Sequence, residues 1–120
     1  MRNLRVTCLA VSLWLASGAG AGLAAEDEVR VVRIVAERFT FSPSQIRVQR
    51  GTVVEFRLRS EDTNHGFRIP AKDIDVVIPK RGRGEVRVRF EASEPGRYPF
   101  ECSKPCGAGH TVMRGEIVVE

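Results

Sequence analysis

Four side chains with soft metal-binding atoms lie close together near the C-terminus of the sequence. Cys102 and Cys106 are four residues apart, His110 follows four residues later, and Met113 follows after three more. Thiolate and thioether sulfurs are soft ligands that favour copper, and imidazole suits either oxidation state of that metal. Zinc sites seldom use methionine, and calcium and magnesium prefer oxygen ligands. The residue types and their spacing therefore predict a copper-binding loop.

The other histidine of the chain lies far upstream of this loop. His65 belongs to the segment Asp62-Thr63-Asn64-His65-Gly66-Phe67, and we expect it where one strand ends and its neighbour begins. That end of a β-sandwich can meet the cysteine loop. His65 is therefore a further candidate ligand.

We expect β-strands to position these side chains. Apolar and charged residues alternate with a period of two over 54–59 and 86–91, which is typical of half-buried strands. No segment carries a convincing helical period. The predicted strands, separated by glycine and proline turns, cover residues 29–35, 45–48, 54–59, 67–69, 75–78, 86–91, 97–101 and 116–119. Short strands in one small domain can bury their apolar faces only against each other, so we predict an all-β fold, a two-sheet antiparallel β-sandwich with Greek-key connections. Tyr98 is expected to brace a corner of this sandwich through its hydroxyl.

The pattern Cys102-Ser103-x-x-Cys106-Gly107-x-x-His110-x-x-Met113, with His65-Gly66-Phe67 upstream, resembles the CuA domain of cytochrome c oxidase subunit II, which has a cupredoxin fold. The resemblance extends over about residues 39–120. It implies that Cys102 and Cys106 bridge two copper ions, that His65 and His110 each bind one of them, and that Met113 is a weak ligand. The backbone carbonyl that completes such a site belongs, by the same resemblance, to Lys104.

The chain departs from this family at three positions. Lys104 stands where subunit II usually carries a glutamate that helps to hold magnesium, so no magnesium site is expected. Pro105 fixes the backbone beside Cys106 without removing a ligand. The single tryptophan, Trp14, lies in the N-terminal segment, so the aromatic patch through which electrons enter subunit II is not expected in the folded domain.

Other interpretations of the same residues stay open. Two cysteines in an exported protein most often form a disulfide, although that would leave His110 and Met113 without a role. Met113 taken alone is typical of core packing, and His65 taken alone is typical of a turn. A mononuclear copper site could use His65, one cysteine, His110 and Met113, so one ion in place of two remains an alternative.

Residues 1–24 are predicted to be a secretory signal, and residues 25–120 the mature domain. Arg2 and Arg5 precede the apolar run 6–15, and small residues lead to a cleavage site after Ala24. The apolar run is shorter than the roughly 20 residues that span a bilayer, so we expect no membrane span after cleavage. Cleavage one residue later and an uncleaved anchor are the alternatives. The mature protein is expected in the periplasm or secreted, as a monomer.

The net positive charge of the chain is halved when this segment is removed. The full sequence has a formal net charge of +4, whereas residues 25–120 hold 17 Lys and Arg against 15 Asp and Glu, a net charge of +2. We therefore expect no nucleic-acid partner. The tight cluster Lys80, Arg81 and Arg83 lies in a predicted turn, where such residues commonly occur.

These observations predict a copper-binding cupredoxin that carries single electrons and is not an enzyme by itself. A rigid β scaffold changes little between oxidation states, and protein ligands would fill every coordinating position, leaving none for substrate. The expected partner is a c-type cytochrome or a haem-copper oxidase. The alternative is a copper chaperone or storage protein that uses the same ligands.

Overall fold

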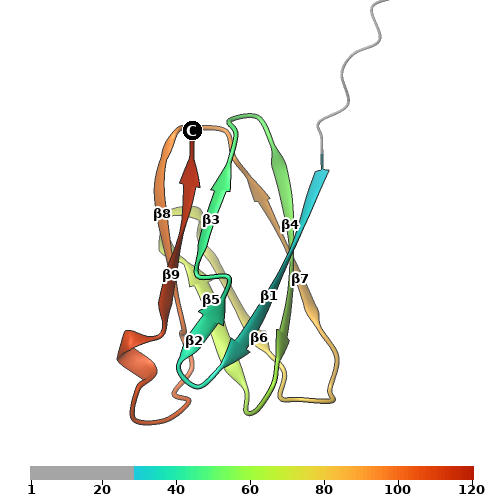
Figure 1. Cartoon of the computed structure of the whole chain (residues 1–120), viewed down its shortest axis with the longest axis vertical. Helices are drawn as coiled ribbons and strands as arrows, with labels where there is room; N and C mark the ends of the chain where they lie inside the picture. The colour runs from blue at the N-terminus through green and yellow to red at the C-terminus, as the bar shows by residue number, and fades with distance from the viewer. Residues whose placement is uncertain (1–28) are drawn as a thin grey trace, which may run out of the picture.

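The computed structural model describes residues 29–120, which form nine strands and two short 3-10 turns (Figure 1). The predicted signal at residues 1–24 and its cleavage site lie outside the described residues. The strands are β1 (Val29–Glu37), β2 (Thr40–Ser42), β3 (Gln45–Val48), β4 (Val53–Ser60), β5 (His65–Ile69), β6 (Ile74–Ile78), β7 (Val86–Glu91), β8 (Gly96–Glu101) and β9 (Arg114–Val119). The 3-10 turns are η1 (Pro70–Lys72) and η2 (His110–Val112).

The strands form two sheets that pack face to face, as Figure 1 shows, so the predicted all-β sandwich is confirmed. One sheet has the strand order β2-β1-β4-β7, and the other has the order β3-β9-β8-β5-β6. The chain changes sheet five times: from β2 to β3, from β3 to β4, from β4 to β5, from β6 to β7 and from β7 to β8. These crossings bring loops from both sheets together at each end of the sandwich.

The sheets are mixed, which corrects the expectation of a wholly antiparallel sandwich. Strand β1 runs parallel to β4, with Val29 opposite Val53 and Ala36 opposite Ser60, and β3 runs parallel to β9. Hairpins force consecutive strands to be antiparallel. Two strands, β2 and β3, lie between β1 and β4 in the sequence, and β3 belongs to the other sheet. No hairpin joins β1 to β4, so the two strands can run in the same direction.

The core lies between the sheets and follows the predicted alternation. Val54, Phe56 and Leu58 on β4 are fully buried, while the intervening residues of that strand are less buried. Rings from both sheets meet in the middle, with centroid separations of 4.9–6.2 Å among Phe41, Phe56, Phe67, Phe90 and Phe100. Such tilted and edge-on aromatic contacts stabilise a core beyond the area that they bury.

One smaller prediction is confirmed, and three short elements are new. The hydroxyl of Tyr98 donates a hydrogen bond to the carbonyl oxygen of Glu94 at 2.7 Å, which confirms that this tyrosine braces a corner. Strand β2 and both 3-10 turns were not predicted. Within residues 29–120, no helix has the length and apolar character needed to cross a membrane.

Candidate metal centre

The candidate centre lies at one end of the sandwich, opposite the end where the chain terminates (Figure 1). Its residues come from two places: the first residue of β5 and the loop of residues 102–113 that joins β8 to β9. All six positions predicted from the sequence lie together in this region: His65, Cys102, the Lys104 carbonyl, Cys106, His110 and Met113.

The two cysteines are buried free thiols that face each other, with their Sγ atoms 3.6 Å apart. Each thiol also faces one imidazole. Cys102 Sγ lies 4.0 Å from His65 Nδ1, and Cys106 Sγ lies 3.7 Å from His110 Nδ1. The four groups therefore form a chain, imidazole to sulfur to sulfur to imidazole.

The two remaining predicted groups each lie beside a different sulfur of this chain. Met113 is fully buried, with its Sδ atom 3.8 Å from Cys106 Sγ. The carbonyl oxygen of Lys104 lies 3.1 Å from Cys102 Sγ, whose thiol donates to it. The thioether therefore lies beside the sulfur that faces His110, and the carbonyl lies beside the sulfur that faces His65.

These separations fit shared metal coordination. Two ligands bound tetrahedrally to one ion at about 2.0–2.3 Å lie roughly 3.3–3.8 Å apart. The sulfur–sulfur and sulfur–nitrogen pairs lie 3.6–4.0 Å apart, and the donor atoms of His65, Cys102 and Cys106 all lie within 4.8 Å of one another. Sulfur and nitrogen donors without a carboxylate are the set that copper prefers. The residues present therefore fit a copper centre.

The ring of His65 is held on its far side by Asp62. His65 is fully buried, and its Nε2 atom lies 2.6 Å from Asp62 Oδ1. The same carboxylate accepts backbone N–H bonds from Arg38 at 2.9 Å and from Thr63 at 2.8 Å. A carboxylate on the second ring nitrogen fixes the orientation of a ligating imidazole. Asp62 therefore directs His65 Nδ1 toward the thiols.

Hydrogen bonding also dominates the ionisation of Asp62. Partial burial raises the pKa of this carboxyl, but the bonds from the Arg38 backbone, from His65 and from the Thr63 backbone outweigh it. They lower the pKa from 3.8 to about 2. Asp62 is therefore a carboxylate at neutral pH and can accept from His65.

Gly66, beside His65, brings β5 into direct contact with the cysteine loop. Its backbone N–H donates to Cys102 Sγ at 3.4 Å. A Cβ atom at this position would lie 2.6 Å from the backbone nitrogen of Ser103 and 2.8 Å from that of Lys104. Only glycine permits this close approach, so Gly66 sets the distance between His65 and the thiols.

Arg38 and Phe39, between β1 and β2, hold the other part of the loop. Arg38 Nε donates to the carbonyl oxygen of Cys106 at 2.8 Å. The Phe39 ring packs against Gly107 and Gly109, where a Cβ atom would collide with it. The segment between Cys106 and His110 is therefore positioned from the opposite sheet.

The environment keeps Cys106 protonated in the metal-free protein. Burial raises the pKa of its thiol, the neighbouring Cys102 raises it further, and the Arg38 charge opposes them with a smaller effect. The resulting pKa is about 11, against an ordinary value of 9.0. Metal binding must therefore displace a proton from this sulfur.

The residues around the candidate ligands were harder to predict from the sequence than the candidate ligands themselves. Asp62, three residues before His65, carried a usable signal, since a carboxylate near a candidate ligand histidine is a common orienting partner. Arg38 and Phe39 lie more than 60 residues from the loop in sequence, and no local pattern marks them. Their role follows only from the way the two sheets pack.

Comparison with known proteins identifies the family of this domain. A family model described as a cupredoxin-like domain matches residues 5–119. Cytochrome c oxidase subunit 2 of Thermus thermophilus is 38% identical over 91 residues, which cover 74% of this chain and 64% of that protein.

Two solved structures are similar to the domain. A chain of a haem-copper terminal oxidase dimer superposes with a TM-score of 0.63 at 30% identity, over 76% of this chain and 65% of that chain. The periplasmic domain of cytochrome oxidase subunit II from Bradyrhizobium japonicum superposes with a TM-score of 0.68 at 17% identity, over 76% and 83%, which shows the shared fold. The chain belongs to the cupredoxin-like family, and the resemblance to the CuA domain of cytochrome c oxidase subunit II is confirmed.

Proposed function

We propose that this protein binds two copper ions in a CuA-like centre and carries single electrons. The arrangement that supports the proposal is the chain of donors in which each buried thiol faces one imidazole and the two sulfurs face each other at 3.6 Å. Two sulfurs between two imidazoles offer bridging ligands and one terminal nitrogen ligand for each of two ions. A mononuclear site would leave one sulfur or one imidazole without a role.

Each residue has a distinct part in the proposal. The Cys102 and Cys106 sulfurs bridge, His65 and His110 bind through Nδ1, and Met113 and the Lys104 carbonyl complete the site. Bound copper supplies a centre that gains and loses one electron. Asp62, Gly66 and Arg38 do not ligate; they hold the ligands in place through the hydrogen bonds described above.

The surroundings of the ligands suit electron transfer. Four of the six proposed ligand residues are buried against the sandwich: His65, Cys102, Cys106 and Met113. A scaffold that fixes its ligands limits the rearrangement that accompanies a change of charge. Protein groups fill the coordinating positions, so no ligand place is left for a substrate, and the protein is proposed to be a carrier and not an enzyme by itself.

The partner and the location belong to the same proposal. We infer a c-type cytochrome or a haem-copper oxidase as the redox partner, a periplasmic or secreted location, cleavage after residue 24, and a monomeric state. Similarity to oxidase subunit 2 and to a subunit II periplasmic domain supports the partner and the location. Mass spectrometry of the exported protein tests the cleavage site.

Copper content and spectra of the oxidised protein test the centre. We expect two copper ions per chain and the electron-spin signal of one unpaired electron shared by both. Cys102→Ser and Cys106→Ser should each abolish the shared signal, because either change removes a bridge. Ser103→Ala is the matched control in the same loop and should keep it. One copper ion per chain, or a Cys102–Cys106 disulfide that survives copper loading under reducing conditions, would contradict the proposal.

Copper retention separates a carrier from a chaperone or storage protein. Ligands that satisfy both ions without external groups should release metal slowly, so a loaded carrier should exchange electrons repeatedly with a cytochrome while losing little copper to a chelator. A delivery protein should transfer copper, preferably as Cu(I), which soft sulfur ligands favour. Copper lost per electron turnover is the quantity to measure. Transfer to an acceptor that outpaces electron exchange would replace the carrier assignment with the chaperone assignment.

A further inference from the structure

The cationic cluster Lys80, Arg81 and Arg83, which the sequence placed in an ordinary turn, lies against the segment that carries His65. The backbone N–H of Arg81 donates to the carbonyl oxygen of Asp62 at 3.0 Å. The backbone N–H of Lys80 donates to Asn64 Oδ1 at 2.7 Å. The loop between β6 and β7 is therefore attached to the metal end of the sandwich.

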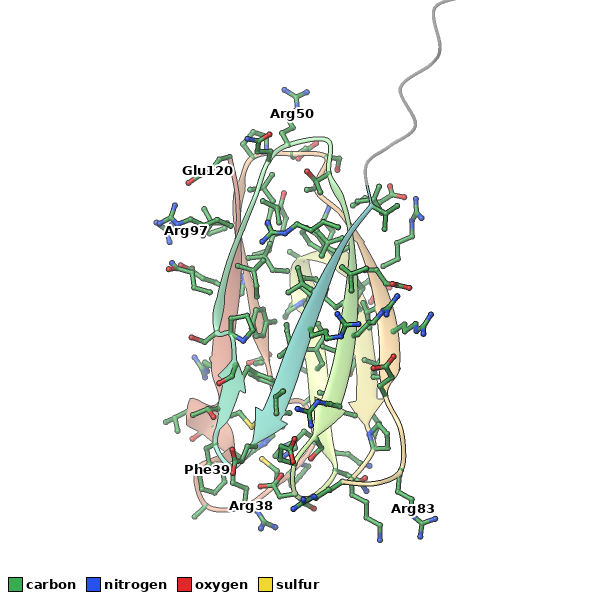
Figure 2. All side chains as sticks on the ribbon, turned by 45° about the vertical axis from the view of Figure 1, so that its right-hand side comes forward. Arg38, Phe39, Arg50, Arg83, Arg97 and Glu120 are labelled. Atoms are coloured by element: carbon green, nitrogen blue, oxygen red, sulfur yellow. The ribbon has the colours of Figure 1, made fainter. Side chains whose placement is uncertain are left out.

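Two further cations reach the same end from other elements. Lys104 lies between the two cysteines, and Arg38 bonds to the Cys106 carbonyl. Figure 2 shows Arg38 and Arg83 at the same end of the molecule, and Arg50 and Arg97 at the opposite end. We refer to the cations of the metal end as the basic rim, which comprises Arg38, Lys80, Arg81, Arg83 and Lys104.

The basic rim is exposed and largely without counter-charges. The Arg81 side chain is 75% exposed, and its one ion pair is a long contact of 3.9 Å with Glu61. Within residues 29–120, the other four rim residues have no carboxylate within 4.0 Å of their charged nitrogens.

Three of the carboxylates nearby already have other partners. Arg59 pairs with Glu61, His65 and backbone N–H groups occupy Asp62, and the hydroxyl of Ser103 donates to Asp75. At the opposite end of the sandwich, by contrast, Arg47 pairs with Glu120 at 2.5 Å and Arg97 pairs with Glu116 at 2.6 Å. Among residues 29–120, Arg50 at that end and Arg33 on β1 also have no carboxylate within 4.0 Å, so unpaired cations occur elsewhere too, but four of them gather at the metal end.

An exposed apolar side chain lies on turn η2, at the same end of the sandwich as the basic rim. Val112, two residues after His110, is 70% exposed, the largest exposure among the exposed large apolar side chains of residues 29–120. His110 itself is half-buried on turn η2. An apolar contact beside charged groups is the arrangement of many transient interfaces, in which the charges steer the encounter and the apolar centre makes close contact.

We propose that the basic rim docks an acidic redox protein, whose carboxylates surround its own electron-transfer edge and bring that edge against Val112 and His110. This inference rests on the proposed carrier function. One electron passes between the partner's reduced haem and the centre, so the haem iron is oxidised and the centre reduced, and no bond forms or breaks. Charge complementarity selects an acidic partner because the rim presents five exposed cations, four of which have no carboxylate of residues 29–120 within 4.0 Å.

Electron exchange with two c-type cytochromes, one acidic and one basic around the haem edge, tests the proposal in the copper-loaded protein. Raising the ionic strength from about 0.01 M to about 0.15 M shortens the Debye length from about 30 Å to about 8 Å. The rate with the acidic cytochrome should fall at least about tenfold over this range, because steering is lost. The rate with the basic cytochrome should rise. Equal, salt-independent rates for both cytochromes would overturn the inference and leave the carrier function standing.

A pair of charge-reversed variants localises the effect. Arg81→Glu with Arg83→Glu changes the rim by four charges without touching a proposed ligand, and should slow the acidic cytochrome about tenfold or more at low salt. Arg50→Glu with Arg97→Glu makes the same change at the opposite end and should leave that rate within about twofold. Both variants should keep two copper ions and the wild-type spectrum. An equal effect of the two variants would overturn the proposal.

An experiment on the copper-free protein tests the basic rim separately from the carrier function. Hexacyanochromate(III), a redox-inert paramagnetic anion, should broaden the amide signals of residues 80–83 and 104 at concentrations that leave residues 50 and 97 unaffected. Uniform broadening would count against the rim. Vesicles of phosphatidylglycerol should not sediment the protein, and sedimentation that Arg81→Glu with Arg83→Glu abolishes would assign the rim to a membrane instead. A missing dinuclear spectrum would refute the carrier function without changing either result.

Discussion

The two imidazoles of the candidate centre differ in almost every structural respect. His65 begins strand β5, is fully buried, and is held through Nε2 by a carboxylate that is itself bonded to two backbone N–H groups. His110 lies on the three-residue turn η2, is half-buried, and has the strongly exposed Val112 as a neighbour. One histidine is part of the core of the fold, and the other belongs to a loop that lies on it.

This difference separates two requirements of a redox centre. The His65 half fixes the geometry, because moving it would require repacking a strand and breaking a buried hydrogen bond. In the proposed function, the His110 half is where a partner gains access, since loops on a rigid scaffold commonly carry contact surfaces. We expect substitutions in the first half to affect folding and metal binding together, and substitutions in the second half to affect mainly the metal and its partner.

Replacing the two histidines in turn should give the largest difference. His65→Ala removes a buried ring and leaves the Asp62 carboxylate without one of its partners, so we expect a loss of about 2–4 kcal/mol in the unfolding free energy of the metal-free protein. His110→Ala should cost about 1 kcal/mol or less, because the ring is only half-buried and lies on a loop. Urea unfolding of the reduced, copper-free protein measures both.

Copper binding provides the second measurement for this pair. Both variants should disturb the spectrum of the loaded protein, because each loses a proposed ligand. Equal stability losses would contradict the division into a core half and a loop half. An unchanged copper count and spectrum in His65→Ala would show that His65 is not a ligand.

Two glycines allow the same comparison by steric means. Gly66→Ala places a Cβ atom against backbone nitrogens of Ser103 and Lys104, whereas Gly109→Ala meets the Phe39 ring, a half-buried side chain that can move. We expect a cost of about 1–3 kcal/mol for Gly66→Ala and under about 1 kcal/mol for Gly109→Ala. Copper affinity should fall more in Gly66→Ala, and thermal unfolding with a copper titration decides. A larger loss in Gly109→Ala would mean that the loop is the more rigid half.

The sequence was enough to predict most of the strands and the set of candidate ligand residues that lie together in the structure. Period-two alternation predicted β4 and β7, because an alternating apolar face leaves a direct record in the sequence, and turn residues on either side marked six further strands. Strand β2 has three residues, too few for a period to show, and the 3-10 turns are equally short. The parallel pairing of β1 with β4 could not be predicted, since alternation looks the same in both strand directions.

The supporting residues show a similar limit. The spacing from Cys102 to Met113 is local, so the loop motif could be recognised, and the end-of-strand position of His65 followed from its flanking turn. The contact between Arg38 and Cys106 joins residues 68 apart in sequence. Such a contact depends on how two sheets are packed, which no local pattern encodes.

Removing Phe39 should loosen the loop half alone. Phe39→Ala leaves Gly107 and Gly109 without the ring that covers them, and we expect a modest cost of about 1–2 kcal/mol, because the ring is only half-buried. Amide hydrogen exchange should speed up over residues 107–112 and stay unchanged over residues 65–69. Phe39→Leu, which retains apolar contact, is the matched control and should restore most of the protection. Faster exchange in both segments would contradict the independence of the two halves.

Met113 should show the smallest effect, because it packs against the loop half from inside the core. Its side chain is fully buried, and its sulfur lies 3.8 Å from Cys106 Sγ. Met113→Leu conserves volume and should cost less than about 1.5 kcal/mol in unfolding free energy. Because a thioether is a weak ligand that tunes redox potential, the variant should retain its full copper content while its reduction potential shifts. Voltammetry and copper analysis of the same sample measure the two quantities. Loss of one copper ion would make Met113 an essential ligand, whereas an unchanged potential would make it a core residue only.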